Sequence, residues 1–182
     1  MSKFIAFDVF GTLIKMNRTL NPYARLLKVG HGDQRRDFMT QNKSIQQFCN
    51  ELGLGHMTTV IERELQGELN ALTLFDDVQD TLHRLRRDGK RIALCSNLAQ
   101  AYGDAVKLLL PGMDAYIFSY EVGAKKPEPA IYQRVCDALE CQARDVTFIG
   151  DSPRADVEGP KNFGMKSKHL NRKSGITLSD LI

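Results

Sequence analysis

The sequence predicts a doubly wound α/β fold with a helical insertion after its first strand. Four short apolar runs are typical of strands buried on both faces of a parallel sheet: Phe4 to Phe7, Ile92 to Cys95, Tyr116 to Phe118 and Val146 to Ile149. Helical patterns lie between and after these runs. The alternation of strands with helices favours a layered α/β domain.

The helices of this domain are expected where apolar residues recur at helical spacing: Val78 to Arg87, Ala101 to Leu110, Ala130 to Leu139 and Ala155 to Asn162. A last strand is predicted at Lys168 to Leu170. A short helix should follow and begin at Thr177 or Ser179, because a hydroxyl side chain can cap its first turn.

The segment from Lys15 to Thr73 breaks the alternation. It contains helix-like patterns, such as Ile45 to Leu52 and Thr59 to Leu72, and no convincing strand. A chain of 182 residues is long enough for one domain that carries a small insertion. We therefore expect an α/β core of residues 1–14 and 74–182 and a helical cap of residues 15–73.

Composition argues against nucleic-acid and membrane partners. The 25 Lys and Arg residues and 22 Asp and Glu residues give a net charge of +3, and the basic residues are scattered along the chain. The longest apolar stretch, around Leu108 to Leu110, is far shorter than the ~20 residues that a membrane helix needs. Because Met1 to Ile5 leads directly into a strand, no signal peptide is expected.

Cysteine usage predicts a cytoplasmic protein with reduced thiols. The four cysteines include no C-x-x-C pair and have no histidine at zinc-finger spacing: Cys49, Cys95, Cys136 and Cys141. Cys95 lies in a buried strand pattern, where a small apolar role is expected. The sequence leaves the oligomeric state open between a monomer and a homodimer.

Polar residues follow each predicted strand, at the sheet edge where ligands bind in open parallel sheets. A single Asp or Ser after a strand is usually a helix cap or turn residue. Here four strands deliver such groups together: Asp8 to Thr12, Ser96 with Asn97, Lys125 to Pro127, and Gly150 to Ser152 with Asp156 beyond. Their combination predicts a catalytic crevice.

Three carboxylates in this crevice, Asp8, Asp151 and Asp156, need a positive partner. Two carboxylates ~4 Å apart repel by ~4 kcal/mol at an effective dielectric constant near 20. Lys126 offers one charge, and Mg²⁺, which prefers carboxylate oxygens, water and phosphate as ligands, offers two more. Such a site suits an aspartate that attacks phosphorus or carbon to form an ester that is later hydrolysed.

These motifs resemble those of the haloacid dehalogenase (HAD) superfamily, in order and over most of Phe4 to Asn171 apart from the insertion. The resemblance implies a Rossmann-like core and a mobile cap that selects the substrate. It also implies these roles: Asp8 as nucleophile, Ser96 and Lys126 as catalytic partners, and Asp8, Asp151, Asp156 and the backbone carbonyl of Phe10 as Mg²⁺ ligands. The residues themselves favour Gly11, Thr12 and Asn97 for substrate binding, because the turn at Gly11 frees backbone N–H groups and Asn97 can donate a hydrogen bond.

One position departs from the phosphatases of this superfamily, which carry a general acid two residues after the nucleophile. Here that position is Phe10, and an aromatic residue there, like Tyr132, resembles the 2-haloacid dehalogenases. The motif Gly150 to Pro153 instead resembles the Mg²⁺-binding phosphatases. The cap arginines Arg18, Arg25, Arg35 and Arg36 are assigned no role, because such residues are more often solvated.

The function most consistent with both motifs is a Mg²⁺-dependent phosphatase that acts on a small phosphorylated metabolite with a good leaving group. Two alternatives stay open at this point. One is a metal-independent 2-haloacid dehalogenase, whose halide leaving group needs no proton. The other is a phosphate-binding regulatory protein that has lost turnover together with its general acid.

Overall fold

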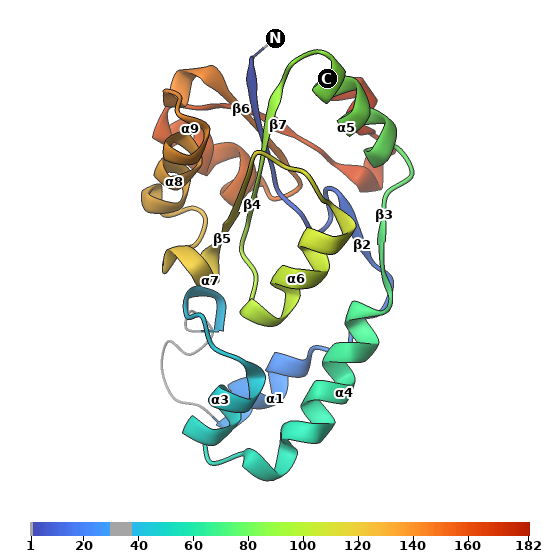
Figure 1. Ribbon diagram of the computed structural model, residues 1–182, viewed down its shortest axis with the longest axis vertical. Coiled ribbons are helices and arrows are strands. Elements are labelled where there is room, and N and C mark those ends of the chain that lie inside the picture. Colours follow the sequence, from blue (N-terminus) through green and yellow to red (C-terminus); the bar gives the residue numbers. More distant parts are fainter. Residues whose placement is uncertain (1, 30–37) are drawn as a thin grey trace.

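The computed structural model describes residues 2–29 and 38–182, and it contains a five-stranded parallel sheet in the order β5-β4-β1-β6-β7 (Figure 1). The strands are β1 (Phe4–Phe7), β4 (Arg91–Ser96), β5 (Ala115–Phe118), β6 (Val146–Gly150) and β7 (Lys166–His169). The four apolar runs are therefore confirmed as strands to within one residue at each end. The last strand begins two residues earlier than predicted.

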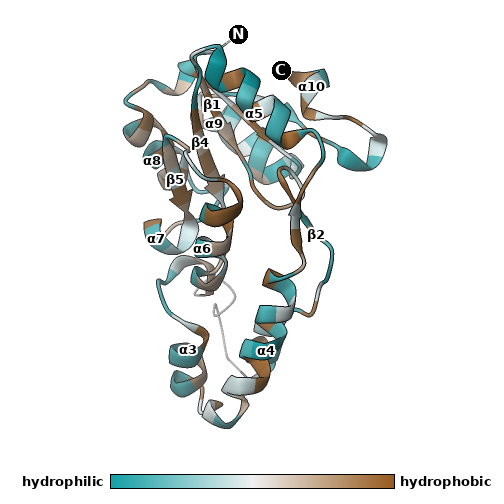
Figure 2. Ribbon diagram, turned by 45° about the vertical axis from the view of Figure 1, so that its right-hand side comes forward, coloured by the Kyte–Doolittle hydropathy of each residue, from teal (hydrophilic) through white to brown (hydrophobic). Residues whose placement is uncertain are grey.

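Helices cover both faces of this sheet, which makes a three-layer α/β/α core. Alternate residues of β1 point to opposite faces: Ile5 and Phe7 join one buried cluster and Ala6 joins another. The first cluster lies under α5 (Val78–Arg87), α6 (Gln100–Leu109) and α10 (Leu178–Leu181), and the second under α8 (Pro129–Leu139) and α9 (Gly159–Phe163). Figure 2 shows strands of the sheet as strongly hydrophobic ribbons between these helices.

The segment after the first strand forms a group of helices below the sheet in Figure 1: α1 (Pro22–Val29), α3 (Ile45–Glu51) and α4 (Thr58–Leu69), with a short 3₁₀ turn at Gly55–Met57. These helices have a buried cluster of their own, which includes Leu26, Phe48 and Ile61. The helical character predicted for this segment is confirmed. Its division from the core as a cap of residues 15–73 stays a proposal.

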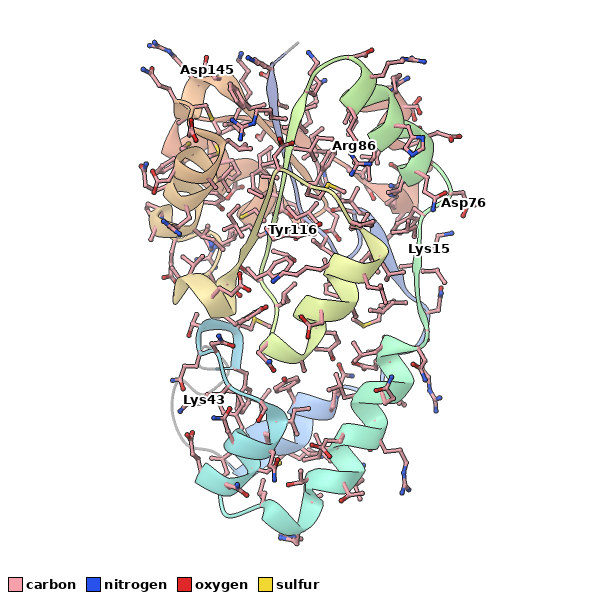
Figure 3. The ribbon with its side chains drawn as sticks, in the orientation of Figure 1. Lys15, Lys43, Asp76, Arg86, Tyr116 and Asp145 are labelled. Carbon is pink, nitrogen blue, oxygen red and sulfur yellow. The ribbon has the colours of Figure 1, made fainter. Side chains whose placement is uncertain are left out.

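The expectation that this segment contains no strand was wrong at both of its ends. β2 (Ile14–Met16) and β3 (Leu72–Leu74) pair as an antiparallel ribbon through which the chain enters and leaves the helical insertion. Each strand has only three residues, too few to show a period of two in the sequence. Lys15 on β2 forms an ion pair with Asp76, 2.9 Å between Nζ and Oδ1, beside the ribbon in Figure 3.

The remaining composition-based expectations concern the cysteines and the membrane. All four cysteines are free thiols, and Cys95 lies buried in β4, where burial raises the pKa of its thiol to about 12. Cys95 therefore stays neutral and fills the small apolar role that was predicted. Within residues 2–29 and 38–182, every helix is too short or too polar to cross a lipid bilayer.

A buried carboxylate, Glu68, joins α4 of the insertion to α6 of the core. Its Oε1 accepts hydrogen bonds from the backbone N–H groups of Leu20 and Asn21, and its Oε2 accepts one from the hydroxyl of Tyr102. The side chain of Glu68 is only 1% exposed. The helical insertion is thus held over the carboxyl ends of the strands by a specific polar contact as well as by the ribbon.

Replacing Glu68 with alanine should lower the free energy of unfolding by about 2 kcal/mol, because three donors lose their acceptor. Gln66→Ala is the matched control on the same helix, since Gln66 makes only an exposed hydrogen bond to Asn70, and it should change stability by less than about 0.5 kcal/mol. Urea denaturation of both variants measures the difference. Equal losses in the two variants would contradict the importance of the Glu68 contact.

Candidate active site

The strand order places the predicted site residues at one edge of the sheet. Asp8 directly follows the central strand β1, which is flanked by β4, whose last residue is Ser96, and by β6, which is followed by Asp151. One oxygen from each of Asp8, Asp151 and Asp156 lies within 4.8 Å of the others. The structure therefore brings Asp8 together with Asp151 and Asp156, which lie more than 140 residues later in the sequence.

Asp8 is held by three side-chain donors. Its Oδ1 accepts from Lys126 Nζ at 2.7 Å and from Ser96 Oγ at 3.2 Å, and its Oδ2 accepts from Thr12 Oγ1 at 3.3 Å. The backbone N–H of Asp8 donates to the carbonyl of Ile149 on β6 at 3.0 Å. These contacts fix the carboxylate in one orientation at the carboxyl edge of the sheet.

Lys126 lies between two of the carboxylates. Its ammonium is 2.7 Å from Asp8 Oδ1 and 2.7 Å from Asp156 Oδ1, and its side chain is 2% exposed. Burial alone would lower the pKa of Lys126, but the attraction of Asp8 and Asp156 outweighs it and raises that pKa. The lysine therefore stays charged in the pH range in which proteins work.

Asn97 holds the backbone of Lys126 in this position. Its Nδ2 donates to the carbonyl of Lys126 at 2.9 Å, and its Oδ1 accepts from the N–H of Lys126 at 2.7 Å. Lys126 follows the short helix α7 (Ser119–Val122), and its loop has no regular structure that would position it otherwise. The amide predicted to contact the substrate thus positions Lys126.

A tight turn after Asp8 depends on Gly11. Gly11 has a φ of +78° and its N–H donates to the carbonyl of Ile14 at 3.0 Å. A Cβ atom at this position would lie 2.3 Å from Asp151 Oδ2. Glycine is therefore required here twice, once for the left-handed backbone conformation and once for the space that Asp151 occupies.

The fourth motif forms a short turn that presents Asp156. Ser152 caps the turn, and its N–H donates to Asp156 Oδ2 at 2.9 Å. The helix predicted from Ala155 to Asn162 begins as a π-helical turn over Pro153–Glu158 and continues as α9. Tyr132 supports this turn from behind the site, because its hydroxyl donates to the carbonyl of Ala155 at 2.6 Å.

The charges of this cluster do not balance within the described residues. Lys126 pairs with Asp8 and Asp156, and no ion pair among the described side chains involves Asp151. Burial and the negative charge of Asp8 raise the pKa of Asp151. Burial also raises the pKa of Asp156 to about 6, although the positive charge of Lys126 opposes this shift. Three converging carboxylate oxygens with the single charge of Lys126 beside them fit a hard divalent cation such as Mg²⁺.

One residue near the site was missed by the sequence analysis. The guanidinium of Arg172 donates to the carbonyl of Thr12 from Nε at 3.2 Å and from Nη2 at 2.7 Å, and it pairs with Asp77 at 2.8 Å. It also stacks 4.2 Å from the ring centre of Phe75. Arg172 therefore holds the turn that carries Thr12 against Asp8, although no motif includes it.

The structure describes two of the four insertion arginines considered above, Arg18 and Arg25, and no described hydrogen bond or ion pair joins either one to the carboxylate cluster. Arg25 forms an ion pair with Glu64, with Nε 3.0 Å from Oε2, and the pair joins α1 to α4. Arg35 and Arg36 lie outside the described residues.

Gly11→Ala should weaken Mg²⁺ binding as well as stability, because the new methyl group displaces Asp151. Gly53→Ala is the matched control: Gly53 has a φ of +68° with no atom within 4 Å of the added Cβ. Both variants should lose about 1–2 kcal/mol from the left-handed conformation. Only Gly11→Ala should lose the rise in melting temperature on adding Mg²⁺, and a full rise in that variant would contradict the steric argument.

Comparison with known proteins identifies the family. The profile of the haloacid dehalogenase-like hydrolases matches residues 3–164. N-acylneuraminate-9-phosphatase from Rattus norvegicus is 28% identical over 114 residues, which are 61% of this chain and 46% of the relative. (S)-2-haloacid dehalogenase 4A from Burkholderia cepacia is 29% identical over 117 residues, which are 62% of this chain and 50% of the relative.

Solved structures share the fold. A HAD family enzyme from Bacteroides thetaiotaomicron, in complex with magnesium and inorganic phosphate, matches with a TM-score of 0.74 and 20% identity, over 100% of both chains. The matched part of the chain corresponds to only 46% of the length of the N-acylneuraminate-9-phosphatase. The family profile nevertheless covers most of the sequence, and the sheet, the motifs and the carboxylate cluster agree with it: this chain belongs to the haloacid dehalogenase-like hydrolases.

Proposed function

We propose that this hydrolase is a Mg²⁺-dependent phosphatase for a small phosphorylated metabolite and that Asp8 is its nucleophile. The observation that carries the proposal is the arrangement around Asp8: a buried carboxylate held by Lys126 and Ser96, with one oxygen from each of Asp151 and Asp156 within 4.8 Å of it. A carboxylate oriented in this way can attack the phosphorus atom of a phosphoryl group when Lys126 and a divalent cation offset the negative charge of the phosphoryl oxygens.

The reaction would proceed in two displacements on phosphorus. In the first, an oxygen of Asp8 forms a bond to phosphorus while the bond to the leaving oxygen breaks, and the substituent departs as an alkoxide or phenolate that takes its proton from solvent. In the second, water adds to the aspartyl phosphate and releases inorganic phosphate, which restores the carboxylate. Mg²⁺ would supply positive charge at the phosphoryl oxygens in both steps.

The remaining site residues would bind the ion and the phosphoryl group. Asp8, Asp151, Asp156 and the backbone carbonyl of Phe10 would hold Mg²⁺. Ser96 Oγ lies close enough to Asp8 to donate to a phosphoryl oxygen, and the turn at Gly11 and Thr12 exposes backbone N–H groups beside it. Asn97 would contact the substrate with the amide hydrogen that Lys126 leaves free.

The family relatives and the thiols support two finer parts of the proposal. Phosphatases are among the matched relatives, including N-acylneuraminate-9-phosphatase, and a fold neighbour was solved with magnesium and phosphate. The four free cysteines favour a reducing, cytoplasmic environment.

Asp8→Asn should abolish the release of phosphate from an aryl or acyl phosphate, because an amide cannot act as the nucleophile. Asp145→Asn is the control, since Asp145 (labelled in Figure 3) directly precedes β6, whereas Asp151 of the carboxylate cluster follows the same strand at its carboxyl end. EDTA should also abolish phosphate release, and added Mg²⁺ should restore it. Activity that persists in Asp8→Asn would contradict the proposed nucleophile.

Phe10, in the place of a general acid, predicts that the rate of hydrolysis depends strongly on the leaving group of the substrate. A positioned general acid contributes about 10²–10⁴-fold to the rate, and the ring of Phe10 cannot donate a proton. Aryl phosphates should therefore be hydrolysed far faster than alkyl phosphates, and Phe10→Asp should narrow this gap by raising kcat for the alkyl substrates. Equal kcat values for aryl and alkyl phosphates in the parent protein would contradict this explanation.

A 2-haloacid dehalogenase is the second candidate. It is favoured by Phe10 and by the dehalogenase relatives, and it predicts halide release from 2-chloropropionate that EDTA does not affect. The negative charge of Asp151 beside Asp8 opposes it, because an anionic haloacid would be repelled without a cation. A chain that binds Mg²⁺ and a phosphate mimic but hydrolyses no substrate would instead be the regulatory phosphate-binding protein.

A further inference from the structure

A cavity of about 530 Å³ lies between the core and the helical insertion. Its core side is formed by Phe10 and by the segment from Asn97 to Tyr102, and its other side by α1 and the residues Phe38 and Met39. This volume is within the range of about 300–1,000 Å³ that is typical of small-molecule sites. The cavity, which we term the Phe10 pocket, is therefore large enough for the organic part of a substrate.

The Phe10 pocket adjoins the carboxylate cluster. Phe10 is two residues beyond Asp8 on the same turn, and Asn97 follows Ser96, whose hydroxyl donates to Asp8 at 3.2 Å. A phosphoryl group bound at Asp8 therefore directs its ester substituent toward this pocket.

The lining of the pocket is apolar and aromatic. The rings of Phe10 and Tyr102 meet edge to face at 5.8 Å, and Tyr23 lies 6.3 Å from Tyr102. Asn21 and Asn97 are the amide side chains of the lining, and the described lining residues include no Lys, Arg, His, Asp or Glu. Burial raises the pKa of both tyrosines, so their hydroxyls stay neutral.

The absence of a charged partner in the described lining selects against charged substrates. A carboxylate or ammonium group moved from water into such a pocket loses its hydration without an ion pair in return. An aromatic ring, in contrast, gains apolar contact and can pack edge to face against Phe10 and Tyr102.

We propose that the substrate carries a neutral, apolar substituent on its phosphate, with an aromatic ring as the preferred occupant of the Phe10 pocket. This proposal rests on the phosphatase function proposed above and adds the class of its substrate. The pocket affects how tightly the substrate binds, whereas the lack of a general acid at Phe10 affects the rate of the chemical step. The proposed preference for an apolar substituent is therefore independent of how good the leaving group is.

The test compares 1-naphthyl phosphate with 4-carboxyphenyl phosphate, whose phenols have similar acidity. The KM of the naphthyl ester should be at least about tenfold lower, because only its substituent is apolar and uncharged. The two kcat values should differ much less than the KM values. Equal KM values with Mg²⁺-dependent phosphate release would overturn the pocket proposal and leave the phosphatase function standing.

Met39→Lys tests the pocket directly, since Met39 lines it and is not a member of the carboxylate cluster. The new charge should raise the KM of the naphthyl ester by about tenfold or more and lower that of the carboxyphenyl ester. Leu108→Lys is the control, because Leu108 is 82% exposed on α6 and outside the pocket. A Met39→Lys variant that behaves like Leu108→Lys would contradict the proposal.

Binding of 1-naphthylmethylphosphonate, which cannot be hydrolysed to phosphate, tests whether the pocket is occupied independently of catalysis. The chain contains no tryptophan, so naphthyl fluorescence reports occupancy of the pocket even if no ester is hydrolysed. Tight binding that Met39→Lys weakens, without phosphate release from either ester, would support the pocket and overturn the phosphatase function. No detectable binding would overturn the pocket proposal whether or not phosphate is released.

Discussion

Lys126 places one buried positive charge between Asp8 and Asp156, two carboxylates that come from opposite ends of the chain. Each ion pair measures 2.7 Å, and both require β1 and β6 to lie side by side in the sheet. Removing one partner of such a buried pair leaves an uncompensated charge, which typically costs about 3–5 kcal/mol. The position of Lys126 therefore constrains the strand order, the loop after α7 and the turn of the fourth motif at once.

The strands and helices of the α/β core could be predicted because each has a pattern of apolar residues within a short stretch of sequence. The four apolar runs, which form β1, β4, β5 and β6, are short and distinct from the helical patterns beside them, so strands and helices could be assigned from their neighbours in the sequence. The ribbon of β2 and β3 could not be found in the same way. Its strands have three residues each and are stabilised by pairing across more than fifty residues, a contact that no local pattern reports.

The carboxylate cluster was also predictable, since residues after parallel strands meet at one edge. At Gly11 the sequence predicts a turn, but only the structure shows that the absence of a side chain there leaves room for Asp151. The contacts of Glu68, Asn97 and Arg172 could not be predicted, because each joins elements that are distant in the sequence. Glu68 and Arg172 belong to no motif, and the motif that contains Asn97 predicts a contact with the substrate but not one with Lys126.

Arg172 gives the site a dependence on the last part of the chain. It holds the carbonyl of Thr12, whose hydroxyl in turn donates to Asp8. During synthesis on a ribosome, β1 and its turn emerge long before Arg172 does. The nascent chain can therefore form much of its sheet while the turn beside Asp8 still lacks this support, so that the fully ordered site is completed only when the segment around Arg172 has been translated and has docked.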